Sequence, residues 1–337
     1  MQDLLIDEKE LRQLVSGRLI AAGLNSIHAE KVADVLVHAD LRGVRSHGVI
    51  RTEHYVRRLH AGSLNKNPNF SFEKIKSGAG LFDADDGMGH PACDLAMGEC
   101  IVLAKEAGIG MVGVHNSSHC GAMSYYVLQA VSKGLIGIAI THTDKLVAPY
   151  GSSKPFFGTN PIAFGFPTKK HQPVVLDMAT SYTAYGKILH AAQSGKSIPD
   201  DWGFDGNGQP TTDPNKIESV TPFGQYKGYG IGMAIDVLTG VLLGAQFGPH
   251  ITAMYGDYDK PRKLASMMIA IDPEIYAGLD RFMSQMDLMV DEIHALPPAP
   301  GFDSVLIAGD NEWENEKRNR AQGVPVLDSI YAFLKQS

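Results

Sequence analysis

Gly108-Ile109-Gly110-Met111-Val112-Gly113-Val114-His115-Asn116-Ser117-Ser118-His119 is the stretch of this chain that decides its fold class. Its first six residues have the Gly-x-Gly-x-x-Gly spacing of the phosphate-binding turn in Rossmann folds, which must follow a strand and open a helix. Here the order is reversed, because a helix-like segment precedes the glycines and a β-rich run follows them. We interpret the glycines as a helix end that leads into a strand. The sequence therefore predicts an α/β chain without a Rossmann site.

Helical and strand patterns alternate on both sides of this stretch. Helices are predicted over residues 8–20, 26–41, 50–59, 91–107, 121–132, 182–192, 226–243 (buried) and 273–296, with two more after residue 307. Strands are predicted over 81–83, 110–114, 135–143, 162–166, 174–177, 263–271 and 305–307. Strands that are followed by helices favour a mainly parallel sheet, in which ligands lie at the carboxyl ends of the strands.

The composition excludes several classes of protein. The 337 residues carry a net charge of −7 and no basic stripe, which argues against a nucleic-acid partner. No apolar run approaches the ~18 residues of a membrane helix, and residues 1–7 lack the basic and apolar regions of a signal peptide. Three cysteines without a Cys-x-x-Cys pair indicate reduced thiols. We therefore expect a cytoplasmic protein without a membrane partner.

Two polar segments carry the candidate chemistry. Ser46-His47 lies just after a predicted helix and is followed by Arg51, while Ser118-His119 lies just after a predicted strand. A guanidinium can hold a carboxylate with two hydrogen bonds, and an imidazole can take a proton near neutral pH. Asp144, at the end of the next strand, could orient an imidazole and stabilise its charged form. Arg51, Tyr55 and Arg58 share one helix face.

Each of these residues also has a structural explanation. A single histidine is more often structural than catalytic, Arg51 could be a surface charge, and Asp144 could cap a loop. His115 and His119 lie four residues apart, but in a loop rather than on one helix face, so we expect no metal. Neither Ser46 nor Ser118 lies in the Gly-x-Ser-x-Gly turn of a serine hydrolase.

Four motifs in order resemble the malate/L-lactate dehydrogenase family, which is of the non-Rossmann type and includes sulfolactate dehydrogenase. The motifs are Arg42-Gly43-Val44-Arg45-Ser46-His47-Gly48, Asn116-Ser117-Ser118-His119, Phe157-Gly158-Thr159-Asn160-Pro161 and Leu176-Asp177-Met178-Ala179-Thr180-Ser181. Within the family, the chain is most similar to the ureidoglycolate dehydrogenases of allantoin breakdown. That narrower resemblance rests on Ser197-Ile198-Pro199-Asp200-Asp201-Trp202, Gly228-Tyr229-Gly230, Met254-Tyr255 and Pro298-Ala299-Pro300-Gly301-Phe302.

The resemblance implies an NAD(P)-dependent homodimer with a sulfolactate dehydrogenase-like α/β fold, in which N- and C-terminal helices pack together beside a mixed sheet. Residues 1–75 would form the N-terminal helical region, packed with 297–337. Residues 76–296 would form the α/β region that binds cofactor and substrate, with a long loop at 194–222.

The resemblance also assigns roles to residues. His119 matches the proton-transfer histidine, and Asp144 matches its acidic partner. Substrate would be bound by Ser46, His47, Arg51 and Thr143. Cofactor would be bound by Thr143, Thr159, Asn160, Asp177, Met178, Ala179, Lys227, Gly309, Asp310 and Asn311, of which the last three depart from the sequence of the ureidoglycolate enzymes.

We therefore predict a dehydrogenase of small 2-hydroxy acids, with (S)-ureidoglycolate, oxidised to oxalurate, as the leading substrate and NAD as the leading cofactor. NADP, and malate, lactate or sulfolactate as substrates, remain alternatives. So does an NADPH-dependent reductase of 2-keto acids, of the diketogulonate type, or of cyclic-imine acids. A non-catalytic binding protein is disfavoured by the intact set of polar residues.

Overall fold

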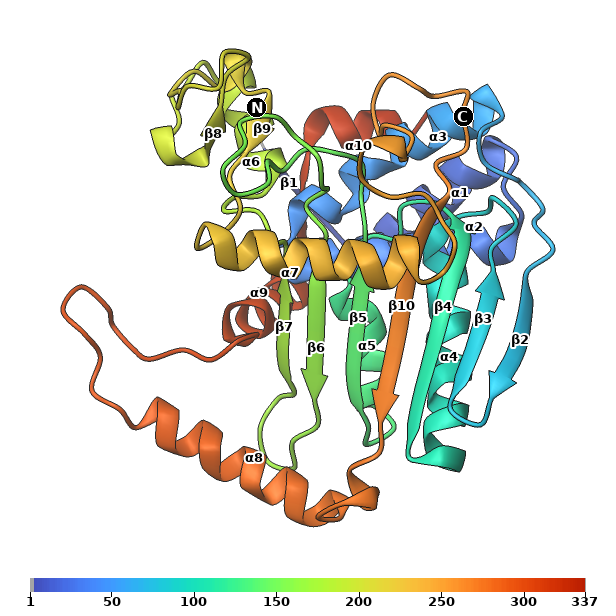
Figure 1. The fold of residues 1–337 in the computed structure, drawn as a ribbon, viewed down its shortest axis with the longest axis vertical. Helices are drawn as coiled ribbons and strands as arrows, with labels where there is room; N and C mark the ends of the chain where they lie inside the picture. Colours follow the sequence, from blue (N-terminus) through green and yellow to red (C-terminus); the bar gives the residue numbers. More distant parts are fainter. Residues whose placement is uncertain (1–2, 337) are drawn as a thin grey trace.

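The computed structural model describes residues 3–336 and is built around one seven-stranded sheet (Figure 1). Across the sheet the strands are β2 (Ser71–Lys76), β3 (Ala79–Asp83), β4 (Ile109–Ser117), β10 (Leu264–Ile271), β5 (Ile136–Thr141), β6 (Ile162–Phe166) and β7 (Val174–Met178). Only β3 and β4 are parallel neighbours; every other pair in this sheet is antiparallel. The sheet is mixed, as the family resemblance implies, and the expectation of a mainly parallel sheet from the alternation of strands and helices was wrong.

The direction of the strands explains why the carboxyl ends of several strands still lie together on one side of the sheet, where the site was predicted. β10 comes from late in the chain and lies antiparallel between β4 and β5, so those two strands keep the same direction without being neighbours. β5, β6 and β7 form successive antiparallel pairs, which gives β7 the direction of β5. The carboxyl ends of β3, β4, β5 and β7 therefore meet at one edge of the sheet.

Two helices, α4 (Gly89–Ala107) and α5 (Ser124–Val131), cover one face of the sheet. Small residues let α5 lie close to the strands, since a Cβ added at Gly137 would lie 2.7 Å from the backbone oxygen of Val127. The predicted glycine-rich helix end is confirmed, because Gly108 ends α4 in the left-handed conformation, with φ 82°, and Gly110 already belongs to β4. The chain therefore has no Rossmann turn at these glycines.

The other face of the sheet is crossed near the site by α7 (Tyr226–Asp236), which continues into a π-helical turn, Val237–Val241, while α8 (Leu279–His294) lies at the opposite end of the strands (Figure 1). The helix predicted over 226–243 was expected to be buried. One side of it packs on the sheet through Ile235 and Leu243, but the other side carries exposed Ile231 and Val241. That expectation was wrong for the single chain.

The N-terminal helices share a core with the C-terminal segment. α1 (Glu8–Ala21), α2 (Ser26–Leu41) and α3 (Thr52–Ala61) enclose this core, and α1 is capped by Asp7, whose carboxylate accepts the N–H of Lys9 at 2.9 Å. β1 (Asp3–Ile6) pairs antiparallel with β11 (Val324–Leu327), and α9 (Asp310–Gln322) and α10 (Asp328–Leu334) flank β11. Arg42 and Glu316 join the two segments at 2.9 Å.

Two predicted elements need correction. Residues 305–307 are not a strand, because their neighbourhood exchanges only one backbone hydrogen bond with β7, from Val175 N–H to the oxygen of Ala308 at 3.2 Å. The predicted loop 194–222 is partly ordered: it follows α6 (Tyr185–Gln193) and contains the short pair β8 (Gly203–Phe204) and β9 (Ser219–Val220). Within residues 3–336, no helix is long and apolar enough to span a membrane.

Candidate active site

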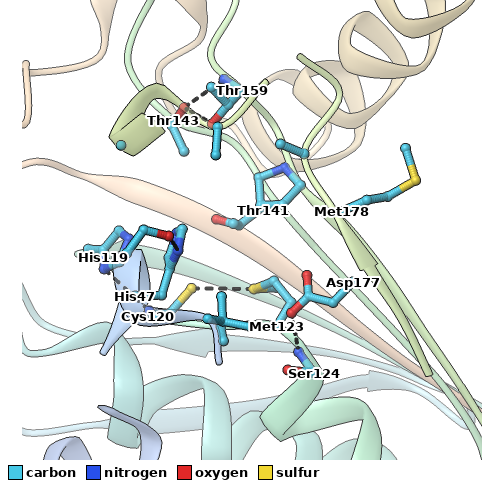
Figure 2. Close-up of a pocket in the computed structure, with 18 of the residues that line it drawn as sticks. His47, His119, Cys120, Met123, Ser124, Thr141, Thr143, Thr159, Asp177 and Met178 are labelled. Carbon is cyan, nitrogen blue, oxygen red and sulfur yellow. Dashed lines mark hydrogen bonds between the residues drawn. The ribbon is translucent and has the colours of Figure 1, made fainter. Parts of the chain in front are cut away.

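A cleft of about 590 Å³ opens where the N-terminal helices meet the carboxyl ends of β4, β5 and β7. Figure 2 shows His47 and His119 together on one wall, with Asp177 and Met178 on another. The walls come from six parts of the chain: residues 42–51, 119–124, 141–146, 159–161, 175–189 and 307–312. Met254, Tyr255, Arg262 and Leu264 add a seventh part. The site is thus assembled between the helical region and the sheet.

His119 follows β4 and points into the cleft. Its loop is fixed by Ser118, whose hydroxyl accepts the N–H of Gly89 at 2.9 Å. Nδ1 of His119 lies 2.7 Å from the hydroxyl of Tyr55 and accepts the N–H of Gly121 at 3.3 Å. Burial, followed by the neighbouring His47 and Arg51, lowers the pKa of His119 well below its usual value. The imidazole is therefore neutral at pH 7.

The first polar segment forms a short 3-10 turn, Arg45–His47, after α2. Its position is set by Gly48, where a Cβ would lie 1.9 Å from the carboxylate of Asp40. The Ser46 hydroxyl contacts Nδ1 of His47 at 3.0 Å, and the rings of His47 and His119 stack with centroids 5.6 Å apart. Burial, with a smaller contribution from Arg51, lowers the pKa of His47 to about 4.

Arg51 lies at the start of α3 and is held from two sides. Its Nε donates to the backbone oxygen of Ser46 at 2.7 Å, and its Nη1 donates to the hydroxyl of Tyr255. Within residues 3–336, no hydrogen bond from its Nη2 is present and no carboxylate neutralises it. A fixed guanidinium with an available donor beside two histidines suits a ligand carboxylate.

The structure corrects the predicted role of Asp144. One carboxylate oxygen accepts a hydrogen bond from Arg262, and the other accepts the N–H of Met254 at 3.1 Å. Asp144 therefore anchors Arg262 and the loop of Met254 in the cleft wall. The partner of His119 Nδ1 is Tyr55 instead, and the pKa of His119 is lowered rather than raised.

The predicted cofactor residues divide into those that line the cleft and those that do not. Thr143, Thr159, Asp177, Met178, Ala179, Gly309 and Asn311 line it. Asn160 is buried behind the wall, where it accepts the N–H of Thr143 at 3.0 Å and donates to the oxygen of Gly232 at 2.9 Å. Lys227 and Asp310 are not part of the lining; Asp310 accepts the N–H of Ile307 at 2.9 Å. Asn160 and Asp310 thus support the wall from behind.

Asp177 and Ser124 shape the middle of the cleft (Figure 2). The carboxylate of Asp177 accepts the N–H of Ser124 at 2.7 Å, which ties the end of β7 to the start of α5. The side chain of Asp177 is accessible from the cleft, but protein surrounds it on its other sides. The loss of hydration caused by this surrounding protein raises the pKa of Asp177 above its usual value.

The far end of the cleft fits the anionic part of a dinucleotide. Gly309, with φ 101°, begins α9, and the free N–H groups of a helix N-terminus attract negative charge. Beside it, the buried guanidinium of Arg42 packs on Trp313 with its carbon 4.0 Å from the ring centroid. Its Nε and Nη2 have no hydrogen-bond partner within residues 3–336. Although Nη1 of Arg42 pairs with Glu316 at 2.9 Å, its other two donor atoms remain without a partner in the described part of the chain, beside this end of the cleft.

Comparisons with known proteins identify the family of the chain. A model of the malate/L-lactate dehydrogenase family matches residues 6–335. The chain belongs to the malate/L-lactate dehydrogenase family. It is similar to ureidoglycolate dehydrogenase (NAD(+)) of Escherichia coli O157:H7, with 38% identity over 98% of this chain and 94% of the relative. It is also similar to L-sulfolactate dehydrogenase of Methanothermobacter thermautotrophicus, with 37% identity over 96% of this chain and 94% of the relative.

The fold of the family is confirmed by a solved structure. Sulfolactate dehydrogenase from Methanocaldococcus jannaschii superposes with a TM-score of 0.91 at 34% identity, covering 98% of this chain and 96% of that one. The predicted non-Rossmann α/β fold and the predicted class, a dehydrogenase of 2-hydroxy acids, are thereby confirmed for this family member. NAD as the predicted cofactor agrees with the ureidoglycolate dehydrogenase relative.

Sequence reasoning missed several residues of the cleft. Tyr55 shares a helix face with Arg51, a spacing that was visible but had no role assigned. Tyr255 belongs to the Met254-Tyr255 motif and contacts Arg51. Arg262 had no local signal, since it reaches the site only through the fold, whereas Lys145 directly follows Asp144 but had no role assigned. Within residues 3–336, no group of three His, Cys, Asp or Glu side chains is arranged to hold a metal ion.

Proposed function

We propose that this family member oxidises (S)-ureidoglycolate to oxalurate with NAD. The observation that carries the proposal is the 38% identity to a ureidoglycolate dehydrogenase over 98% of the chain, together with Arg51 and His119 in one cleft. A substrate that joins a carboxylate to a neighbouring hydroxyl matches a fixed guanidinium beside a neutral imidazole.

The substrate is bound and deprotonated by residues of the helical region and β4. Arg51 binds the carboxylate through its available Nη2, with Ser46 Oγ as a second donor. His47 is neutral and donates to the carboxylate or the reacting oxygen. His119 takes the hydroxyl proton on Nε2. When bound, the nicotinamide accepts the hydride that leaves the hydroxyl-bearing carbon.

The cofactor is held by the rest of the cleft. Thr143 and Thr159, whose hydroxyls lie 3.5 Å apart, and residues 177–179 would contact the nicotinamide half. Gly309 and Asn311 at the start of α9 would hold the diphosphate, with the Nε and Nη2 donors of Arg42, which have no partner within residues 3–336, behind them. Lys227 lies outside the lining and would need to approach from α7 to contact the cofactor.

A second candidate substrate class is favoured by Lys145. Its side chain is exposed at the cleft and makes no hydrogen bond or ion pair with any residue in 3–336. A free cation in addition to Arg51 would suit a second acid group, as in malate or sulfolactate. Ureidoglycolate instead carries a neutral ureido group, so the two classes differ in charge at this position.

A steady-state screen with NAD and NADP decides between these candidates. Ureidoglycolate, malate, sulfolactate and lactate are oxidised in one direction, and diketogulonate and cyclic-imine acids are reduced in the other. We expect the highest kcat/KM with ureidoglycolate and NAD. A higher kcat/KM with malate or sulfolactate would show that the substrate carries a second acid group. No hydride transfer with any of these compounds would indicate a non-catalytic binding protein.

His119→Asn is the matched variant for the role of the proton acceptor. Turnover should fall by about 10²–10⁴-fold, the usual contribution of general base catalysis, while NAD still binds. Lys133→Gln is the control, because this residue lies at the opposite end of the sheet, between α5 and β5. Turnover of His119→Asn near that of the control would refute the assignment.

The single chain leaves an apolar surface that fits a second copy. Ile231, Met233, Val237, Leu238 and Val241 are exposed on α7 and its π-helical turn. Leu288 and Met289 are exposed on α8, beyond the other end of the same sheet face. An exposed patch of this kind usually marks an interface, and sedimentation equilibrium should therefore show a homodimer.

The three buried, unpaired cysteines support the cytoplasm as the compartment of the protein.

A further inference from the structure

Nδ1 of His119 faces one backbone N–H donor and one hydroxyl, which can donate or accept. The backbone N–H of Gly121 donates to it at 3.3 Å, and a backbone amide can only donate. The hydroxyl of Tyr55 lies 2.7 Å from the same nitrogen and forms the shorter of these two hydrogen bonds. A protonated Nδ1 would direct its hydrogen at the hydrogen of Gly121. The geometry thus favours a lone pair on Nδ1.

Behind Tyr55 lies a second histidine, which continues the network. Nε2 of His90 is 3.4 Å from the Tyr55 hydroxyl, and the side chain of His90 is fully buried. Its Nδ1 has no partner within residues 3–336. Burial raises the pKa of Tyr55 and lowers the pKa of His90 to about 3, so both side chains stay neutral. Each of these neutral groups can therefore donate one hydrogen bond to the next, from His90 through Tyr55 to His119.

We infer that Tyr55 is a positioning residue that, with the N–H of Gly121, holds neutral His119 with its proton on Nε2. In this arrangement His90 Nε2–H donates to Tyr55, Tyr55 donates to His119 Nδ1, and His119 Nε2–H points into the cleft. The inference rests on the proposed function, in which Nε2 is the atom that exchanges the substrate proton. It adds that the resting site presents a hydrogen-bond donor, which suits the keto acid.

Oxidation of the hydroxy acid requires the opposite direction of the same network. Tyr55 then donates to His90 Nε2, and His119 Nδ1–H donates to the Tyr55 oxygen, which leaves a lone pair on His119 Nε2. This tautomer is the less populated one, because its Nδ1–H gives up the hydrogen bond from the Gly121 N–H. The substrate hydroxyl gives its proton to that lone pair as the hydride leaves carbon for the nicotinamide, and His119 becomes an imidazolium. This cation releases one proton to water through the cleft. The Tyr55 hydroxyl is the group that can serve both directions, because it donates and accepts.

The tautomer can be observed without any catalytic assay. Two-bond ¹⁵N–¹H correlation spectra of protein labelled in histidine distinguish a protonated ring nitrogen from an unprotonated one, and His119→Asn identifies the signals of His119. In the wild type between pH 6 and 8, Nε2 of His119 should carry the proton and Nδ1 should be unprotonated. A protonated Nδ1, or a ring that titrates near pH 6.5, would overturn the inference even if the substrate screen succeeds.

Tyr55→Phe tests the contribution of the hydroxyl. The fraction of the Nε2–H tautomer should fall. The value of kcat/KM for the hydroxy acid should still fall about 10-fold, because the imidazolium formed during oxidation loses the Tyr55 oxygen as the acceptor of its Nδ1–H. The same factor should apply to reduction, and the dissociation constant of NAD should not change. Tyr125→Phe is the control, since its hydroxyl contacts Lys31 at 3.2 Å on another helix pair. An unchanged tautomer in Tyr55→Phe would show that Gly121 alone sets it.

Discussion

Arg58 offers the sharpest test of how the substrate end of the cleft is held together. This buried guanidinium lies one turn beyond Tyr55 on α3 and donates to four backbone oxygens of one loop. The acceptors are Ala253 at 2.8 Å, Met254 at 2.9 Å, and Asp257 and Lys260 at 3.2 Å each. The same loop brings Tyr255 onto Arg51 and the N–H of Met254 onto Asp144. Arg58 thus fixes residues that form the substrate wall.

The size of the effect follows from these contacts. Hydrogen bonds from a charged donor contribute about 1.5–3 kcal/mol each, so the set is worth at most about 6–12 kcal/mol. Much of this is recovered in Arg58→Met, because the loop oxygens turn to water and no guanidinium has to be buried. We expect a net loss of about 2–4 kcal/mol in the free energy of unfolding. Loosening Tyr255 and Met254 should raise KM for the hydroxy acid about 10-fold, or ~1.4 kcal/mol.

Urea denaturation and steady-state kinetics measure the two consequences. Arg57→Met is the matched control, because it removes the same charge from the neighbouring, exposed residue, whose guanidinium only stacks on Tyr258 at 3.8 Å. KM for NAD should be unchanged in both variants, since the loop lies at the substrate end. If Arg58→Met matched Arg57→Met in both stability and KM for the hydroxy acid, the loop would not depend on this clamp.

Two further variants test the substrate anchor and a buried carboxyl group. Arg51→Lys should raise KM for the hydroxy acid about 10- to 100-fold without changing NAD affinity, since one ammonium cannot replace a guanidinium that is fixed by two neighbours; an unchanged KM would place the substrate carboxylate elsewhere. Burial raises the pKa of Asp40 from 3.8 to about 7, against the opposing hydrogen bond from Val49 N–H. A raised folded-state pKa gives stability that is present below pH 3.8 and lost as the pH rises to about 7. The free energy of unfolding of Asp40→Asn, relative to that of the wild type, should therefore rise by up to about 4 kcal/mol between pH 4 and pH 8. A difference between the two proteins that does not change with pH would contradict this.

Local patterns predicted the elements that carry the site. The helix end at Gly108 and the strand that leads to His119 both follow from residues within one or two turns of the position in question. The order of helix, glycine and strand was enough to reject a Rossmann turn. The strand predicted at 305–307 does not form. Its apolar composition could not show whether a neighbouring strand has free backbone groups to pair with, and β7 forms a backbone hydrogen bond there only to the oxygen of Ala308.

The role of Asp144 could not be derived from the sequence in the same way. Its position after β5 was predicted correctly, but its partners come from residues 254 and 262, more than a hundred positions away. Tyr55 could be grouped with Arg51 by helical spacing, yet its contact with His119 depends on how α3 packs beside the end of β4. The spacing of residues along a helix determines which side chains share one helix face, but the packing of that helix determines which other residues they contact.

The sequence by itself determined the class of fold, the family and the residues that can exchange a proton or bind a carboxylate, because these depend on short motifs and local spacing. The tertiary structure decided the direction of the sheet and the pairing of polar groups inside the cleft. β10 enters the sheet between β4 and β5 only after the chain has folded back, and this non-local pairing brings Arg262 to Asp144. It leaves Tyr55, and not a carboxylate, as the partner of His119, because a buried hydrogen-bonding group pairs with whichever partner the packing places within reach.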